Sequence, residues 1–182
     1  MFGNRCAGRG VGAATAMLLA SEGAMVVIND LDEEVAVKTA DSVGGLAVPG
    51  SVTDPLFPDQ LIQSTLDAFG TIDIIVNNAG FLFDGMLHKM DDKQWEAILD
   101  CHISAPFRLI RAAAPHMRDA AKAEIDKHGA AKDRSGARDF CAAAAGGRVA
   151  HAHAVLGPPA HLLAGQVARR GVHDAKFVGV QL

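Results

Sequence analysis

Apolar runs alternate, along the first half of the chain, with segments whose apolar positions recur every three or four residues. The runs at 24–28 and 72–76 are almost wholly apolar, as expected of strands buried on both faces of a parallel sheet. A shorter run at 46–48 predicts a third strand. Strands that alternate with helices predict right-handed crossovers and a doubly wound α/β sheet. The predicted helices that alternate with these strands occupy 11–21, 32–42 and 58–69.

Beyond Gly80 the pattern becomes helical. Asp91 is a candidate N-cap for one amphipathic helix, and a second helix follows it. Pro106 predicts a boundary between the two helices, and Pro115 predicts a kink or a break in the second. Gly129 is a natural stop for that helix.

The charge and the amino-acid composition of the chain change near residue 129. Residues 1–129 hold 10 Lys and Arg against 18 Asp and Glu, whereas residues 130–182 hold 7 against 3. The second segment is rich in Ala, Gly, Arg and His, and its weak apolar runs at 149–156 and 177–180 are its candidate strands. We therefore predict a partial dinucleotide-binding domain over 1–129 and a low-complexity tail over 130–182. The scattered arginines lack interleaved aromatic residues, so no nucleic-acid partner is expected.

Composition narrows the class of protein further. A chain of 182 residues with 49% hydrophobic residues can form one domain with a sizeable core. No apolar run is long enough to cross a bilayer, and the first residues do not resemble a targeting peptide, so we expect a cytoplasmic protein without a membrane partner. No metal site is predicted, because the histidine group of the tail has no carboxylate or cysteine nearby: His151, His153 and His161.

Three motifs point to a nucleotide. Gly8-Arg9-Gly10-Val11-Gly12 opens a helix, and such a turn lets backbone N–H groups approach a pyrophosphate. Asp30 ends the next strand, where a carboxylate can accept hydrogen bonds from the ribose hydroxyls of NAD and repel the 2′-phosphate of NADP. The alternative is that Asp30 is a helix N-cap, aided by Asp32. Asn77-Asn78-Ala79-Gly80 closes the strand at 72–76.

In this order the motifs resemble the short-chain dehydrogenase/reductase family, over about residues 6–129. The residues of these motifs are most similar to those of members that act as 3-oxoacyl-carrier-protein reductases or hydroxyacyl dehydrogenases. The resemblance implies a Rossmann-type sheet, hydride transfer between NAD(H) and an alcohol or ketone substrate, and subunit pairing through helices in 92–118. The cofactor-binding residues that it implies are Gly8, Arg9, Gly10, Val11, Gly12, Asp30, Leu31, Ser51, Val52, Asn78, Ala79 and Gly80.

The chain departs from the family at its beginning. Arg5 and Cys6 occupy the positions of the family's Thr-Gly, and only five residues precede Cys6. In a doubly wound sheet the first strand lies centrally, between the strands predicted at 24–28 and 72–76. We therefore predict an incomplete sheet with two unpaired ladder edges, each unpaired buried group costing about 1–3 kcal/mol.

The catalytic residues of the family are the second departure. Members use a tyrosine as the general acid and base, with a lysine four residues later. This sequence contains no tyrosine, and Val172 lies four residues before Lys176. Ser51 replaces an aspartate that often contacts the adenine. His102 stands at the position of an asparagine that helps to relay protons, so it is the one catalytic candidate, and the alternative is a packed structural histidine.

Three functions stay open at this point. The first is a NAD-dependent oxidoreductase with a small-molecule substrate. The second is a catalytically inactive fragment or a frame-shifted gene product, because residues 130–182 lack the family pattern. The third is a non-catalytic module that forms homo-oligomers through the helices in 92–118.

Overall fold

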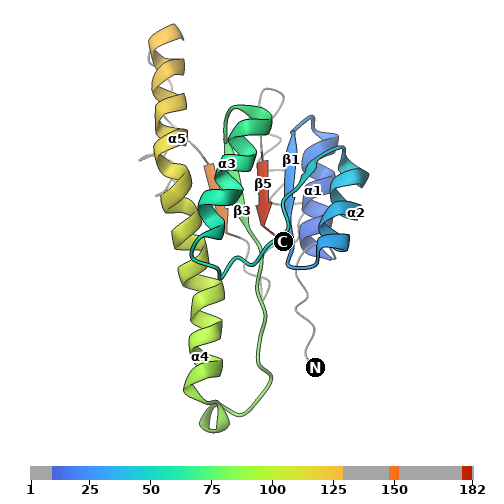
Figure 1. Ribbon diagram of the computed structural model, residues 1–182, viewed down its shortest axis with the longest axis vertical. Coiled ribbons are helices and arrows are strands. Elements are labelled where there is room, and N and C mark those ends of the chain that lie inside the picture. The colour runs from blue at the N-terminus through green and yellow to red at the C-terminus, as the bar shows by residue number, and fades with distance from the viewer. Residues whose placement is uncertain (1–9, 129–147, 152–177, 182) are drawn as a thin grey trace.

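The strands form one parallel sheet in the order β2-β1-β5-β3-β4 in the computed structural model (Figure 1). The structure describes residues 10–128, 148–151 and 178–181. Its strands are β1 (Val26–Asn29), β2 (Leu46–Ala47), β3 (Ile74–Asn77), β4 (Arg148–His151) and β5 (Val178–Gln181). Its helices are α1 (Val11–Ser21), α2 (Glu33–Val43), α3 (Phe57–Phe69), the 3₁₀ turn η1 (Leu87–Lys89), α4 (Asp92–Leu99), the π-helical turn η2 (Asp100–Ser104) and α5 (Ala105–His128). The doubly wound α/β class that the sequence predicts is confirmed.

Two apolar cores lie on opposite faces of the sheet. Val26 and Ile28 of β1 belong to the core that includes residues of α1 and α2. Val27 of β1 and Ile75 of β3 belong to the other core, with residues of α3 and α5. Figure 1 shows the two helix pairs on either side of the sheet. Because both faces are covered, the strands show continuous apolar runs and not alternation.

Capping residues fix where two of the helices begin. The Asp32 side chain accepts a hydrogen bond from the Val35 N–H at 3.4 Å and caps α2, whose C-cap Gly44 has a left-handed φ of 62°. Asp91 and Gln94 form a reciprocal capping box at the start of α4. The prediction that Asp91 is an N-cap is therefore confirmed.

Helices α4 and α5 follow each other almost collinearly, joined by η2 (Figure 1). α5 begins at Ala105, next to the boundary predicted at Pro106, and continues through Pro115. The alternative of a break at Pro115 is wrong. Pro115 is exposed, so water can satisfy the carbonyl group that the proline leaves unbonded. No helix within the described part of the chain is long and apolar enough to cross a membrane.

Strand β5 occupies the central position that the sequence predicts to be vacant. Gly179 pairs in register with Val27 of β1 on one side and with Ile75 of β3 on the other. In the usual doubly wound order this position belongs to the first strand of the chain. The prediction of two unpaired ladder edges is therefore wrong: a parallel strand from the far end of the sequence pairs with both of them.

Strand β4 extends the sheet on the other side of β3, with Val149 in register with Ile75. Strands β4 and β5 confirm the two predicted strands over the parts that the structure describes, 149–151 and 178–180, and residues 152–156 and 177 lie outside the described residues. The division of the chain at residue 129 stays a prediction, although these two strands pair in the same sheet as β1 and β3.

Candidate functional site

The carboxyl ends of four adjacent strands lie in register at one edge of the sheet. Asn29 of β1 and Asn77 of β3 are both in register with Gln181 of β5, and Asn77 is also in register with His151 of β4. In open α/β sheets, ligands bind outside the carboxyl ends of the strands. The predicted site residues that follow β1 and β3 therefore lie at the edge where this fold binds ligands.

The glycine turn leads into α1. Gly10 is the N-cap, with a φ of 75° that glycine adopts without strain, and no side chain within the described residues caps the helix. A Cβ at Gly10 would meet no atom of the described residues within 4 Å. Gly12 is buried in the first turn, whereas Val11 is exposed. Gly8 and Arg9 lie outside the described residues.

Asp30 follows β1 directly and is only 4% exposed. Its Oδ1 accepts a hydrogen bond from the Asp32 N–H at 2.9 Å. Asp32 is the N-cap of α2, so the alternative that Asp30 caps this helix is wrong. Asp32 and Ala13 line one groove between α2 and α1, which brings the turn after β1 near the first turn of α1. Leu31, between the two aspartates, is 55% exposed.

The segment after β2 runs along the end of β1. The Gly50 N–H donates to the Asp30 carbonyl oxygen at 3.0 Å. Asn29 Nδ2 donates to the carbonyl oxygens of Val48 at 2.9 Å and of Gly50 at 3.0 Å. These bonds hold Gly50 against the end of β1, and the predicted residues Ser51 and Val52, both half-buried, follow Gly50 in the chain.

Two asparagines end β3. Asn77 and Asn78 are both buried. Neither Nδ2 nor Oδ1 of Asn77 has a hydrogen-bond partner within the part of the chain that the structure describes. An unpaired buried amide is unfavourable, so this position is suited to a partner that a ligand would supply.

His102 lies against the loop that follows β3. Its Nε2 is 2.8 Å from the Phe81 carbonyl oxygen and 3.3 Å from the Phe81 amide nitrogen. A Cβ at Gly80 would overlap with Cε1 of the ring. The structure thus brings His102 together with the predicted residue Gly80. Its catalytic role stays a prediction.

His102 belongs to the π-helical turn η2, a feature that is frequent at functional sites. The preceding residue, Cys101, is buried and has a free thiol. Burial and, to a lesser degree, the carboxylate of Asp100 raise the pKa of this thiol. Cys101 is therefore a neutral core residue and no nucleophile.

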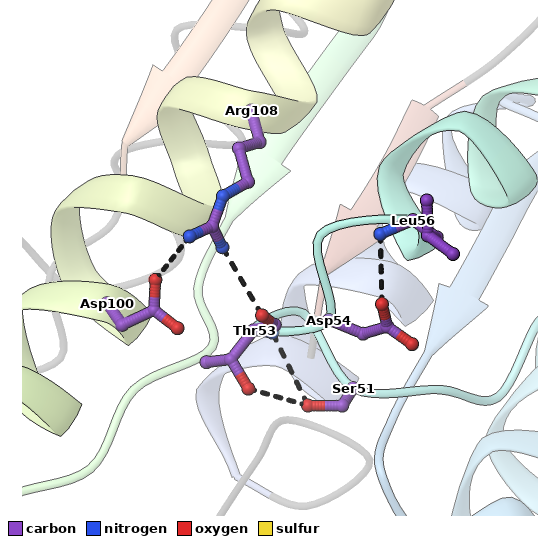
Figure 2. Close-up of polar contacts among 6 residues, drawn as sticks. All are labelled: Ser51, Thr53, Asp54, Leu56, Asp100 and Arg108. Atoms are coloured by element: carbon purple, nitrogen blue, oxygen red, sulfur yellow. Dashed lines mark hydrogen bonds and ion pairs between the residues drawn. The ribbon is translucent and has the colours of Figure 1, made fainter.

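Sequence reasoning missed one polar cluster at this edge. Arg108 of α5 forms an ion pair with Asp100 and donates to the carbonyl oxygen of Thr53 (Figure 2). An arginine eight residues after an aspartate is no recognised motif, and nothing local marks Thr53 as its partner. No group of His, Cys, Asp and Glu residues among those described could hold a metal ion.

Comparisons with known proteins agree with this geometry. The family model described as enoyl-(acyl carrier protein) reductase matches residues 6–126. The chain is 38% identical to a 3-oxoacyl-(acyl-carrier-protein) reductase of Synechocystis, with 61% of this chain and 47% of that protein covered. It is 39% identical to hydroxyacyl-CoA dehydrogenase ChsB1 of Mycobacterium tuberculosis, with 64% of this chain and 39% of that protein covered.

A solved structure gives the same result. A 3-ketoacyl-(acyl-carrier-protein) reductase from Brucella melitensis complexed with NADH has a TM-score of 0.62 and 28% identity, with 65% of this chain and 50% of that chain covered. The chain belongs to the short-chain dehydrogenase/reductase family. It spans about half, or less, of the length of these relatives.

Proposed function

We propose that the chain is the cofactor-binding part of a NAD-dependent oxidoreductase that interconverts hydroxyacyl and oxoacyl compounds. The observation that carries the proposal is the buried carboxylate of Asp30 at the end of β1, followed by Asp32, which lines one groove together with Ala13 of the first turn of α1. A carboxylate at this position accepts hydrogen bonds from ribose hydroxyls and repels a 2′-phosphate, which favours NAD over NADP. The named activities of the relatives support the substrate class.

The residues present fit a dinucleotide at its adenine end. The uncapped amides at the start of α1 offer N–H donors and a partial positive charge to a pyrophosphate. Asp30 would hold the ribose, and Ser51 with Val52 would lie beside the adenine. The hydrogen bond from the Gly50 N–H to the Asp30 carbonyl oxygen supports this assignment, since it holds the residue before Ser51 against the end of β1. The exposed Leu31 would offer the adenine an apolar surface.

At the other end, the segment from Asn78 to Gly80 would lie beside the nicotinamide. NAD, when bound, supplies the acceptor for a hydride that leaves the carbinol carbon of the alcohol. The alcohol proton needs an acceptor as well. The candidate nitrogen, His102 Nε2, lies 2.8 Å from the Phe81 carbonyl oxygen, so it contacts the backbone. We therefore propose that these 182 residues bind NAD without turnover, because the sequence also holds no tyrosine.

Calorimetric titration of the purified chain with NAD and with NADP tests this proposal. We expect saturable binding of NAD and weaker binding of NADP. A parallel assay follows absorbance of NADH during incubation with a 3-hydroxyacyl-CoA. Absence of NAD binding would overturn the proposal, and measurable turnover would show that a proton acceptor is present among these residues.

We also propose that two copies of the chain associate through α4 and α5. Four exposed apolar side chains recur at every fourth position along the nearly collinear helices α4 and α5 and the turn η2 between them, which we call the rod. The side chains are 37% to 59% exposed. The guanidinium of Arg111 lies over the ring of Phe107, with 5.2 Å between the Cζ atom and the ring centroid. We call them the apolar stripe: Trp95, Leu99, Ile103 and Phe107. A row of this kind is typical of a helix-pairing surface.

Size-exclusion chromatography with light scattering tests the association. We expect a dimer for the wild-type chain and a monomer for Ile103→Asp, because a charge in the centre of an apolar interface has no partner. Val37→Asp is the matched control, because Val37 is an exposed apolar residue of α2, 41% exposed, outside the stripe. A wild-type monomer at high concentration would contradict the proposal.

A further inference from the structure

Arg108 joins the rod of α4 and α5 to the loop that follows β2. Its Nη2 lies 2.7 Å from Oδ1 of Asp100, and its Nη1 donates to the carbonyl oxygen of Thr53 at 3.3 Å. Figure 2 shows the guanidinium between these two acceptors. The Arg108 side chain is 22% exposed and that of Asp100 is 34% exposed, so the pair is partly shielded from water.

The loop at 51–56 is fixed at three further points. Ser51 Oγ and Thr53 Oγ1 are 2.8 Å apart, and the Asp54 N–H donates to the Ser51 carbonyl oxygen at 3.1 Å. Asp54 Oδ1 accepts from the Leu56 N–H at 2.9 Å (Figure 2). These contacts are local to the loop. The hydrogen bond from Arg108 joins the loop to another element of the fold, α5.

The second partner of Arg108, Asp100, belongs to the π-helical turn η2. Asp100 is the first residue of η2, and His102, two residues later, contacts the Phe81 backbone. The Arg108 side chain therefore connects the segment at Thr53, beside the proposed adenine position, to the turn η2, which contacts the loop after β3. Arginine suits this role because its planar fork holds two acceptors at a fixed angle, which a lysine ammonium does not.

We propose that Arg108 is a positioning residue for the adenine half of the dinucleotide, acting through the Thr53 carbonyl group. The proposal rests on the proposed function, since it assumes that a dinucleotide binds beside Asp30. Without Arg108, the Thr53 carbonyl loses its partner and the segment from Ser51 to Thr53 gains freedom. A ligand must then order that segment on binding, which lowers its affinity.

The test compares Arg108→Met with Arg118→Met. Both variants lose an arginine of α5, but the ion pair of Arg118 is with its exposed neighbour Asp119, at 3.2 Å. Calorimetry with ADP-ribose as the ligand is expected to give about tenfold weaker binding for Arg108→Met, which corresponds to loss of one strong hydrogen bond. Arg118→Met is expected to bind as the wild-type chain does. Arg108→Lys, which keeps the charge beside Asp100, is expected to fall between them.

Hydrogen exchange of the ligand-free chain supplies a readout that a general loss of stability would not reproduce. In Arg108→Met the amides of Thr53 and Asp54 are expected to exchange faster, while those of β3 keep their wild-type rates. Wild-type affinity for ADP-ribose in Arg108→Met, or unchanged exchange at 53–54, would overturn the proposal. Failure of the proposed function is seen separately, as a wild-type chain that binds no ADP-ribose.

Discussion

The imidazole of His102 lies against the backbone at Gly80 and Phe81, with Nε2 at 2.8 Å from the Phe81 carbonyl oxygen. Gly80 leaves room for the ring, because a Cβ at that position would overlap with Cε1 of His102. The identity of one residue therefore depends on the other, although 21 residues separate Phe81 from His102 in the chain.

Gly80→Ala is expected to destabilise the chain by about 1–3 kcal/mol, because the added methyl group overpacks against the ring. In a His102→Ala background the same substitution is expected to be nearly neutral, since the ring is gone. Urea unfolding of both single variants and of the double variant gives the coupling energy. Additive effects would show that the cost of the added methyl group does not arise from the His102 ring.

Asp30→Asn separates the charge of Asp30 from its hydrogen bond. The amide oxygen can still accept from the Asp32 N–H, but the negative charge is lost. We expect NAD affinity to fall about tenfold and the preference for NAD over NADP to shrink, because a charged acceptor contributes about 1.5–3 kcal/mol. Calorimetric titration measures both. Asp91→Asn is the control, since Asp91 Oδ1 accepts a comparable bond from the Gln94 N–H at 2.7 Å, at the start of α4.

Asn29 and Asn77 have opposite expected responses to replacement by leucine. Asn29→Leu leaves the carbonyl oxygens of Val48 and Gly50 without their donor, so a loss of about 2–4 kcal/mol is expected. Asn77→Leu removes two amide atoms that have no partner within the described residues, so stability within about 1 kcal/mol of the wild type, or above it, is expected. Urea unfolding distinguishes the two. Equal losses would mean that Asn77 has a partner in solution.

Removal of residues 178–182 is expected to abolish cooperative unfolding. The deletion takes away β5 and so exposes the facing edges of β1 and β3, with four residue pairs lost on each side. Each lost ladder bond contributes about 1 kcal/mol, so the total exceeds what a marginally stable domain tolerates. Circular dichroism during urea titration is the measurement, and removal of Leu182 alone is the control. A sharp, wild-type transition in the deletion variant would contradict the central placement of β5.

The thiol of Cys101 predicts a pH dependence of stability. Burial raises the pKa of this thiol in the folded chain above its unfolded value. The folded state therefore holds the proton more tightly, and this contribution to stability is present below the unfolded pKa and is lost as pH rises through the folded pKa. Unfolding free energies measured across the alkaline range are expected to fall less steeply for Cys101→Ala. Parallel slopes would show that the thiol is ionised equally in both states.

Short-range features of the sequence were sufficient to predict most of the elements. The helix at 11–21, the capping aspartate at 91 and the buried strands before Asp30 and Asn77 all depend on neighbours within a few residues. The position of Asp30 at the carboxyl end of β1 also follows from the apolar run before it, whereas its role toward a cofactor stays a prediction. These features also carry the resemblance to the family, which the comparisons confirm.

Tertiary structure decided which partners these elements take. The strand between β1 and β3 comes from residues 178–181, because two open ladder edges bond any parallel strand that reaches them, irrespective of its place in the chain. The contacts of His102 with Phe81 and of Arg108 with Thr53 join residues 21 and 55 positions apart. Local propensity holds no information about such pairs, since their energy appears only when the folded backbone has brought the two segments together.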